Sequence, residues 1–325
     1  MSTMRAVQIP QHGDSSVLAV ANIPKPSPKP NEVLVKVAAA GINFIDTYQR
    51  SGLYPQKMPF VVGREGAGEI AEVGANVRDF KVGDRVVFLG PSAYAEYAAV
   101  SDDKVAKLPG SLSYEKAAAA LLQGMTGWSL VRQAYEVKAG DWVLIHAAAG
   151  GMGLLLCQMC KLLGANVVGT TSTEAKAALA KKAGADYVVD YSQGYDGVIQ
   201  KINELTDNKG VHVVLDGVGA ATFDASLKAV RLLGTVISFG NASGAVPPIS
   251  IMRLAEKNVR LMRPTLFNYI TTREDFNKLA GDVLKLVDEN KLDVNIYKEY
   301  PLEDVKQAHD DLEGRKTTGK LILKL

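Results

Sequence analysis

Residues 142–164 constrain the fold more than any other stretch of the chain, and they read WVLIHAAAGGMGLLLCQMCKLLG. The stretch begins with a short apolar run typical of a buried strand and passes through small residues and a glycine-rich turn. It continues as an amphipathic helical pattern that ends near Gly164. A strand, a tight turn and a helix in this order predict the start of a βαβ unit.

The turn has the spacing Ala148-x-Gly150-x-x-Gly153, which is a dinucleotide-binding fingerprint with alanine in place of its first glycine. Gly150 lets the backbone approach a pyrophosphate, and Gly153 lets the helix pack closely on its strand. The phosphates would accept hydrogen bonds from the free N–H groups of the helix N-terminus. Such a turn often marks only tight packing, but its place between a predicted strand and a predicted helix favours a nucleotide site.

Length and charge narrow the class of protein. A chain of 325 residues suits two domains rather than one. There are 37 basic and 35 acidic side chains, so no broad charged field would attract nucleic acid or a membrane surface. The first residues lack the apolar core of a signal peptide, and no apolar run is long enough to span a bilayer. We therefore expect a cytoplasmic protein without a membrane partner, and we do not expect nucleic acid as a partner.

The chain before the central stretch is mostly β in pattern. Short apolar runs between turn-rich segments predict a small barrel rather than a parallel sheet, and the clearest are residues 5–9, 33–38, 68–73 and 85–89. A helical, alanine-rich pattern then covers residues 114–134, with Ser113 as its cap.

The chain after the central stretch alternates strand-like and helical patterns. The strand-like runs are residues 166–169, 187–190, 211–216, 235–239 and 259–262, and the helical patterns are residues 174–183, 197–205 and 223–232. This alternation predicts an α/β fold with a doubly wound parallel sheet. Toward the C-terminus we expect a helix at 273–287, a strand at 294–297, a short helix after Pro301 and a strand at 320–325 that returns to complete the first domain.

The second predicted strand of the sheet indicates which dinucleotide binds. NAD sites place a carboxylate about 20 residues after the start of the fingerprint, yet residues 167–173 contain none. Ser172 and Lys176 suit the 2′-phosphate of NADPH instead. The alternative is that Ser172 or Thr173 only caps the next helix and that Lys176 is a solvated surface charge.

Six motifs in order carry a resemblance that covers essentially the whole chain. They are Gly41-Ile42-Asn43-Phe44-Ile45-Asp46, Gly63-Arg64-Glu65-Gly66-Ala67-Gly68, Val82-Gly83-Asp84-Arg85-Val86, Ala147-Ala148-Ala149-Gly150-Gly151-Met152-Gly153, Ser238-Phe239-Gly240-Asn241 and Arg263-Pro264. With these motifs the chain resembles the zinc-free medium-chain dehydrogenases/reductases of the quinone oxidoreductase (ζ-crystallin-like) family.

The resemblance implies two domains and a cofactor. Residues 1–125, completed by 265–325, would form a GroES-like β-barrel catalytic domain, and residues 126–264 a Rossmann domain that binds NADPH. It also implies a homodimer through the edge strands of the Rossmann sheets, for which residues 235–239 and 259–262 are the candidates.

The candidate site residues come mainly from the same resemblance, with Tyr48 added as an available hydrogen-bond donor and Gly150 and Gly153 added from the fingerprint. The catalytic candidates are Asn43, Asp46, Tyr48 and Tyr54. The cofactor-binding candidates are Asn43, Thr126, Gly150, Gly151, Met152, Gly153, Ser172, Lys176, Tyr191, Phe239, Gly240, Arg263 and Arg315. Gly217 departs from the family, since relatives often have serine at this position.

We expect no metal. Related alcohol dehydrogenases have a cysteine at the position of Asn43 and a histidine at that of Arg64. Cys157 and Cys160 have CxxC spacing, but they fall in the middle of an apolar helical pattern and suit core packing.

Two further patterns carry no expectation of function. Gly314-x-x-x-x-Gly319-Lys320 resembles a phosphate-binding P-loop, but Leu321 replaces the required hydroxyl residue and a strand follows instead of a helix. The four histidines have no metal-ligand spacing, and His146 suits a satisfied residue at a strand end.

We therefore expect an NADPH-dependent reductase that passes a hydride, or its electrons, to quinones or α,β-unsaturated carbonyl compounds. Without a metal, hydrogen-bond donors such as Asn43, Tyr48 and Tyr54 would activate the acceptor oxygen. The alternatives are an enone or alkenal double-bond reductase, and a non-catalytic NADPH-binding protein of the crystallin-like or RNA-binding kind.

Overall fold

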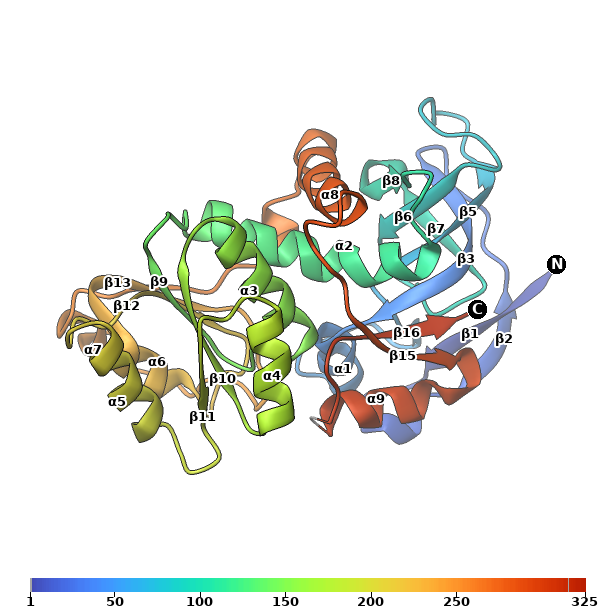
Figure 1. Cartoon of the computed structure of the whole chain (residues 1–325). Coiled ribbons are helices and arrows are strands. Elements are labelled where there is room, and N and C mark those ends of the chain that lie inside the picture. The colour runs from blue at the N-terminus through green and yellow to red at the C-terminus, as the bar shows by residue number, and fades with distance from the viewer. Residues whose placement is uncertain (1, 315) are drawn as a thin grey trace. The chain divides into compact units, whose positions relative to one another are not determined.

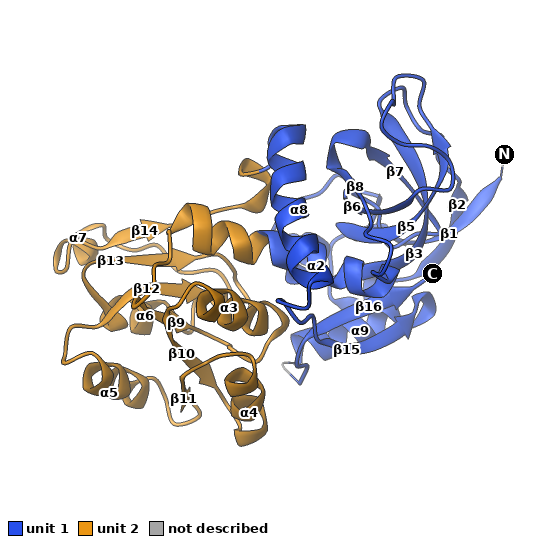
Figure 2. Cartoon of the chain, turned by 45° about the horizontal axis from the view of Figure 1, so that its top comes forward, with its two compact units in different colours: residues 1–125, 270–325 blue, residues 126–269 orange. Residues whose placement is uncertain are grey.

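The computed structural model describes residues 2–314 and 316–325. Contacts within the chain divide it into two compact units, which Figure 2 shows in different colours. Unit 1 comprises Met1–Met125 and Ile270–Leu325, and unit 2 comprises Thr126–Tyr269. The catalytic and NADPH-binding roles predicted for the two parts of the chain remain proposals.

Unit 1 contains two sheets. A three-stranded antiparallel sheet has the order β2 (Val20–Pro24), β1 (Thr3–Ile9), β4 (Phe60–Val61). The second sheet has the order β15 (Ile296–Pro301), β16 (Lys320–Lys324), β3 (Glu32–Ile42), β5 (Glu65–Val73), β6 (Arg85–Leu89), β8 (Val105–Lys107), and β7 (Tyr97–Ser101) also pairs with β3. The β-rich pattern predicted before residue 100 is therefore confirmed.

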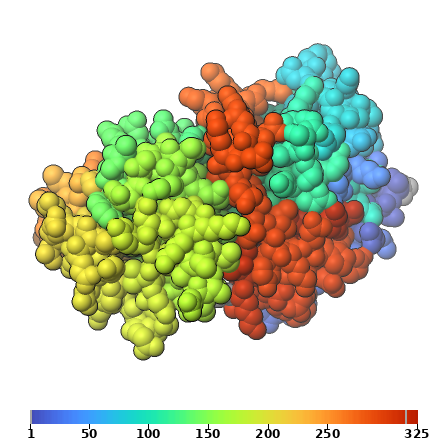
Figure 3. All heavy atoms as spheres, viewed as in Figure 1, coloured from blue at the N-terminus to red at the C-terminus, as the bar shows by residue number. Residues whose placement is uncertain are grey.

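Strand β3 is the centre of unit 1. Its first residues pair with β7 and its last residues pair with β16, while β5 pairs along its other edge. The final strand of the chain thus completes a sheet that begins near the N-terminus. In Figure 3 the red C-terminal segment covers the lower part of the visible face of unit 1, next to the blue N-terminal segment.

The core of unit 1 lies against the inner faces of these strands. Alternate residues of β3, such as Val33, Val35 and Val37, pack with Phe88 of β6 and Leu323 of β16. This follows from the two-residue period of a strand, which directs every second side chain to the same face.

The helices of unit 1 are α1 (Phe44–Ser51), α8 (Arg273–Asp288) and α9 (Val305–Glu313), and α2 (Tyr114–Ser129) runs from unit 1 into unit 2. Ser113 caps α2 as predicted, because its Oγ accepts a hydrogen bond from the backbone N–H of Lys116 at 3.2 Å. The predicted helix 114–134 changes to a π-helical turn over Leu130–Ala134.

Unit 2 is the predicted doubly wound parallel sheet. Its strand order is β11 (Tyr187–Asp190), β10 (Asn166–Thr171), β9 (Trp142–Ile145), β12 (Val211–Asp216), β13 (Val230–Ser238), β14 (Arg260–Met262). This is the Rossmann order, in which the strand sequence reverses between the first and fourth strands, here β9 and β12. Ligands of such sheets bind at the carboxyl ends of the strands near that reversal.

The connecting helices cover both faces of the sheet (Figure 1). Figure 1 shows α3 (Gly151–Leu162) and α4 (Glu174–Lys182) on one face, and α5 (Asp196–Leu205) and α6 (Phe223–Ala229) on the other. A short helix, α7 (Met252–Ala255), precedes β14. Within the described residues, no helix combines the length and the apolar character needed to cross a membrane.

Three predictions about elements were wrong. The helix predicted over 223–232 ends at Ala229, because β13 begins at Val230 and contains a register shift. Leu232 and Leu233 extended the apolar pattern that predicted the helix, but they are not part of a buried helix face, since they are 61% and 58% exposed. The strand predicted at 294–297 is β15, which begins later and ends at Pro301. Finally, β13 lies between β12 and β14, so residues 235–239 are not an edge strand.

Candidate functional site

The first group of predicted site residues lies where β3 leads into α1. Asn43 is the N-cap of α1, and its backbone N–H donates a hydrogen bond of 2.8 Å to Oδ2 of Asp46. A carboxylate at this third helical position satisfies an N–H group that the helix leaves free. The geometry of the turn therefore brings together two of the predicted site residues, Asn43 and Asp46.

The side chain of Asn43 is held by a buried ion pair that the sequence analysis missed. Its Oδ1 accepts from Nζ of Lys320 at 2.6 Å, and its Nδ2 donates to Oε1 of Glu65 at 2.7 Å. Lysine only donates, so the amide oxygen must be the atom that faces it. Nδ2 also donates to the carbonyl of Gly41 at 3.3 Å, so both amide atoms are turned toward the protein.

The ion pair itself is fully buried. Lys320 Nζ lies 2.5 Å from Glu65 Oε1, and the two side chains are 1% and 0% exposed. Glu65 Oε2 accepts from the backbone N–H of Leu122 at 2.6 Å. Gly41 leaves room for this carboxylate, since a Cβ there would lie 2.4 Å from Oε1. We call Asn43, Asp46, Glu65, Tyr94 and Lys320 the Asn43 cluster.

Asp46 is the titratable group of this cluster. It is completely buried, and its Oδ2 also accepts from the Tyr94 hydroxyl at 2.7 Å. Burial raises the pKa of Asp46 to about 6, against the opposing effects of the Tyr94 and Asn43 hydrogen bonds. Within the described chain its Oδ1 has no hydrogen-bond partner. A carboxyl group with this pKa can hold or release a proton near neutral pH.

The two predicted tyrosines pack against each other beside α1. The rings of Tyr48 and Tyr54 lie 5.3 Å apart in an edge-on arrangement, and Phe44 lies 6.1 Å from Tyr48. Tyr54 is half-buried, and its backbone N–H donates to the carbonyl of Tyr48 at 3.0 Å. The structure thus brings together Tyr48 on α1, the helix that carries Asp46, and Tyr54 in the loop after it.

The glycine-rich turn of unit 2 has the predicted form. β9 ends at Ile145, Gly150 is the N-cap of α3, and the helix begins at Gly151. A Cβ on Gly153 would lie 2.3 Å from the carbonyl oxygen of Ala147, so only glycine permits this close packing. The helix N-terminus therefore presents free N–H groups at the carboxyl end of the sheet.

The alanine that replaces the first glycine of the fingerprint is accommodated by a second glycine. Ala148 is completely buried, and a Cβ on Gly169 of β10 would lie 2.7 Å from the Ala148 methyl group. The methyl group at position 148 fits because position 169 has no side chain.

The predicted 2′-phosphate residues follow two neighbouring strands. Ser172 follows β10 and Tyr191 follows β11, and the N–H of Tyr191 donates to the carbonyl of Thr171 at 3.0 Å. Thr173 caps α4 by accepting from the N–H of Lys176 at 3.3 Å, as the alternative interpretation of this segment held. Capping by Thr173 leaves Ser172 and the Lys176 side chain as candidates for the phosphate.

Phe239, Gly240 and Arg263 lie together beyond β13 and β14. Nη1 of Arg263 donates to the carbonyls of Ser238 and Gly240, both at 3.0 Å. A Cβ on Gly217 would lie 2.8 Å from the Phe239 ring, which explains why this chain has glycine where relatives often have serine. Of the last two candidates, Thr126 lies in α2, and Arg315 lies outside the described residues.

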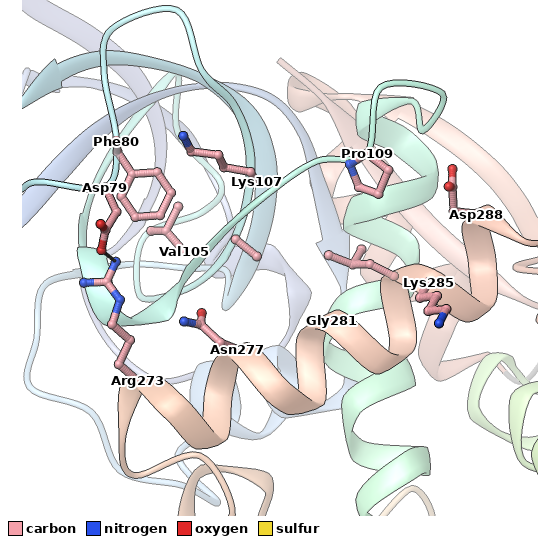
Figure 4. A pocket seen from close by; sticks show the side chains of 12 residues that line it. Asp79, Phe80, Val105, Lys107, Pro109, Arg273, Asn277, Gly281, Lys285 and Asp288 are labelled. Carbon is pink, nitrogen blue, oxygen red and sulfur yellow. Dashed lines mark ion pairs between the residues drawn. The ribbon is translucent and has the colours of Figure 1, made fainter.

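A groove of about 480 Å³ in unit 1 contains none of the predicted residues. Figure 4 shows that it lies between α8 and the segment around β8, with Phe80 and Val105 on one side and Asn277 and Gly281 on the other. Arg273 at its rim is paired with Asp79 at 3.2 Å. The shape of the surface at this groove therefore does not identify the Asn43 cluster, which is elsewhere in unit 1.

The two cysteines are core residues. Cys157 and Cys160 are completely buried in α3. Burial raises the pKa of Cys157 to about 12 and that of Cys160 further, so neither is a thiolate at neutral pH. In residues 2–314 and 316–325, no group of three or more His, Cys, Asp and Glu side chains is placed to hold a metal ion.

Comparisons with known proteins cover both units. A family model described as an alcohol dehydrogenase GroES-like domain matches residues 29–110, and one described as a zinc-binding dehydrogenase matches residues 151–285. A probable quinone oxidoreductase from Schizosaccharomyces pombe is 44% identical over 319 residues, which are 98% of this chain and 96% of that protein. A 2-haloacrylate reductase from a Burkholderia species is 37% identical over 309 residues, 91% of this chain and 92% of that protein.

A solved structure has the same fold. The Escherichia coli quinone oxidoreductase complexed with NADPH superposes with a TM-score of 0.96 at 40% sequence identity, covering 99% of this chain and all of that one.

Proposed function

Because the chain belongs to the quinone oxidoreductase family of zinc-free medium-chain dehydrogenases/reductases, we propose that it transfers a hydride, or its electrons, from NADPH to quinones. The observation that carries the proposal is the match along the whole chain to a quinone oxidoreductase whose structure contains NADPH. It extends across both units and so includes the Asn43 cluster as well as the glycine-rich turn.

The residues of unit 2 fit NADPH. The close packing at Gly153 and the free N–H groups of α3 suit a pyrophosphate, which needs close backbone approach and donors. Ser172, Lys176 and Tyr191 offer hydroxyl groups and a positive charge at the carboxyl end of β10 and β11. Residues 167–173 contain no carboxylate to repel a 2′-phosphate.

When bound, NADPH supplies the hydride, and the residues of unit 1 would orient the acceptor and stabilise the charge that develops on its oxygen. The hydroxyls of Tyr48 and Tyr54 are the proposed donors. Asn43 is better suited to positioning, because its amide is already engaged by Lys320 and Glu65. Asp46 would exchange a proton at a pH just below neutral, where its pKa of about 6 lies, and it fixes the start of α1.

A second candidate is reduction of an activated carbon–carbon double bond. The relative described as a 2-haloacrylate reductase favours it, since such an acceptor is an unsaturated acid rather than a quinone. Both reactions require the same cofactor and the same oxygen-activating donors, so only the acceptor distinguishes them.

We also propose a homodimer and a cytoplasmic location. β14 is the edge strand of the unit 2 sheet, so one side of its backbone is free to pair with a second copy. Exposed apolar residues gather in the segments around it: Leu232, Leu233, Ile251, Met252, Leu261 and Met262. Such a patch beside an open sheet edge suits a partner chain. Two free cysteines without a disulfide are compatible with a reducing compartment.

The test compares NADPH oxidation with a quinone, with an enone and without an acceptor. We expect the quinone to support the fastest turnover. Faster turnover with the enone would favour the second candidate, and NADPH binding without oxidation by either acceptor would indicate a non-catalytic binding protein.

Single variants test the shared role of the donors. Asn43→Ala, Tyr48→Phe and Tyr54→Phe should each lower quinone-dependent turnover by tens to hundreds of fold, about 1.5 to 3 kcal/mol, without abolishing it. NADPH binding is measured separately for each variant. Complete loss of turnover in Tyr54→Phe alone, with normal NADPH binding, would identify Tyr54 as an essential proton donor instead.

A further inference from the structure

A chain of buried polar groups crosses the carboxyl ends of the central strands of unit 2, and the proposed reaction does not use it. His146, directly after β9, has Nδ1 3.2 Å from the hydroxyl of Thr170 in β10 and Nε2 3.1 Å from the hydroxyl of Ser226 in α6. The Ser226 hydroxyl donates to Oδ2 of Asp216 at the end of β12, at 2.8 Å. At the other end, the Thr170 hydroxyl accepts from the backbone N–H of Ala147 at 3.3 Å.

The direction of every bond in this chain follows from Asp216. A carboxylate only accepts, and it is a stronger acceptor than the carbonyl of Thr222, which lies 3.0 Å from the same Ser226 hydroxyl. The Ser226 hydroxyl therefore donates its hydrogen bond to Asp216, and its oxygen must accept a hydrogen bond from Nε2 of His146. Burial lowers the pKa of His146, so the ring is neutral and has one N–H group. With that group on Nε2, Nδ1 must accept from Thr170.

Asp216 is itself fixed by the loop that follows it. Its Oδ1 accepts from the backbone N–H groups of Val218 at 2.9 Å and Gly219 at 3.1 Å, and from the hydroxyl of Thr222 at 2.7 Å. Asp216 and Thr222 are completely buried. The carboxylate is thus a rigid anchor at the strand-order reversal of the sheet, where Rossmann domains bind their ligands.

The other end of the chain is the start of the nucleotide turn. Ala147 has a φ of 52°, a left-handed conformation that is strained for a residue with a side chain, and its carbonyl oxygen is the nearest atom that a Cβ on Gly153 would meet. A small rotation at Ala147 would move the helix N-terminus that is proposed to receive the pyrophosphate.

We propose that His146 is a positioning residue for NADPH: as the Nε2–H tautomer it connects the nucleotide turn to Asp216 and holds the turn in its binding conformation. This rests on the proposed binding of NADPH by unit 2. A buried polar chain contributes little net stability relative to apolar packing, whereas it fixes one geometry. The expected role is therefore in cofactor affinity rather than in folding.

His212 provides a matched control. It lies at the opposite, amino-terminal end of the same sheet, where its Nδ1 accepts from the backbone N–H of Trp142 at 2.9 Å. Both histidines thus make hydrogen bonds between neighbouring strands of one sheet, but only His146 adjoins the nucleotide turn.

The experiment titrates NADPH, without an acceptor, into the full-length wild type, His146→Leu and His212→Leu, after urea unfolding has shown that each is folded. We expect the Kd of His146→Leu to rise at least tenfold and that of His212→Leu to change less than twofold. Thr170→Val breaks the link to Ala147 without removing the imidazole, and it should raise the Kd at least threefold. This variant keeps the test decisive if His146→Leu does not fold.

A second measurement is independent of affinity. The ¹⁵N spectrum of the wild-type histidines, with His146 assigned by its loss in the variant or in His146→Gln, should show the Nε2–H tautomer at pH 7. An Nδ1–H tautomer, or unchanged NADPH affinity in a folded His146→Leu or Thr170→Val variant, would overturn the inference. If the wild type itself does not bind NADPH, the proposed function is wrong. That result differs from a wild type that binds NADPH and a folded variant that binds it equally well, which contradicts only the role of His146.

Discussion

Replacement of Lys320 by methionine tests the Asn43 cluster most directly. The substitution keeps the length and apolar stem of the side chain but removes the ammonium group that lies 2.5 Å from Glu65 and 2.6 Å from Asn43. It leaves a carboxylate uncompensated at 0% exposure, so the free energy of unfolding of unit 1 should fall by about 3 to 5 kcal/mol.

The double variant Lys320→Met, Glu65→Gln separates charge burial from function. Without the charge on residue 65 this position no longer buries an unpaired carboxylate, and the remaining cost there is about 1 to 3 kcal/mol for one imperfectly satisfied amide. The double variant should therefore be more stable than Lys320→Met alone. Its quinone-dependent turnover should still fall at least tenfold, because Oδ1 of Asn43 has lost the donor that fixes it.

Denaturation in urea provides the assay. Both tryptophans, Trp128 and Trp142, lie in unit 2, so fluorescence excited at 295 nm reports that unit, whereas far-ultraviolet circular dichroism reports both. Lys320→Met should lower the midpoint seen by circular dichroism more than the midpoint seen by fluorescence. A loss of less than about 1 kcal/mol, or a double variant whose loss equals the sum of the two single losses, would refute the account of a coupled buried pair.

Three further outcomes are expected. Lys176→Ala should reduce the preference for NADPH over NADH by roughly 1 to 3 kcal/mol, measured by titration of both cofactors, and equal affinities in the wild type would contradict the assignment. Purified protein should contain no stoichiometric zinc and keep its activity in a chelator, since Asn43 and Arg64 replace the ligands of zinc-bearing relatives; one zinc per chain in elemental analysis would reverse this. Burial, with a smaller effect of Arg50, lowers the pKa of His309 from 6.5 to about 3, so only the unfolded state binds this proton as the pH falls below about 6.5. The difference in unfolding free energy between the wild type and His309→Gln should therefore shift against the wild type as the pH falls from 7 to 4, and a constant difference would show that His309 is not buried in its neutral form.

The sequence predicted the sheet of unit 2 well because its signals are local. Each strand is a short apolar run bounded by turn residues, and the Rossmann order follows from the alternation with helices. The sequence did not predict the first residues of β13, because Leu232 and Leu233 are apolar residues that suit a buried helix face in the sequence but are exposed in the structure.

The predicted site was less complete because its contacts are not local. Asn43 and Asp46 were found through one short motif, but Lys320 is 277 residues from Asn43 and reaches it only through the pairing of β16 with β3. Lys320 was named from the sequence only as part of an incomplete P-loop and as the first residue of the predicted strand 320–325, with no role in the site. A lysine at the head of an apolar strand is the signal that could have identified it, because a buried lysine requires a buried acid.

The position of Lys320 also sets an order of events during synthesis of the protein. Unit 2 is complete once residue 269 has left the ribosome. In contrast, the partner of Glu65 is Lys320, which is synthesised 255 residues later, on the strand that pairs with β3. Until then, closing unit 1 would bury a carboxylate without its counter-ion, which costs several kcal/mol. The nascent chain should therefore carry a folded nucleotide unit next to an open first unit, which closes only after its last strand has been made.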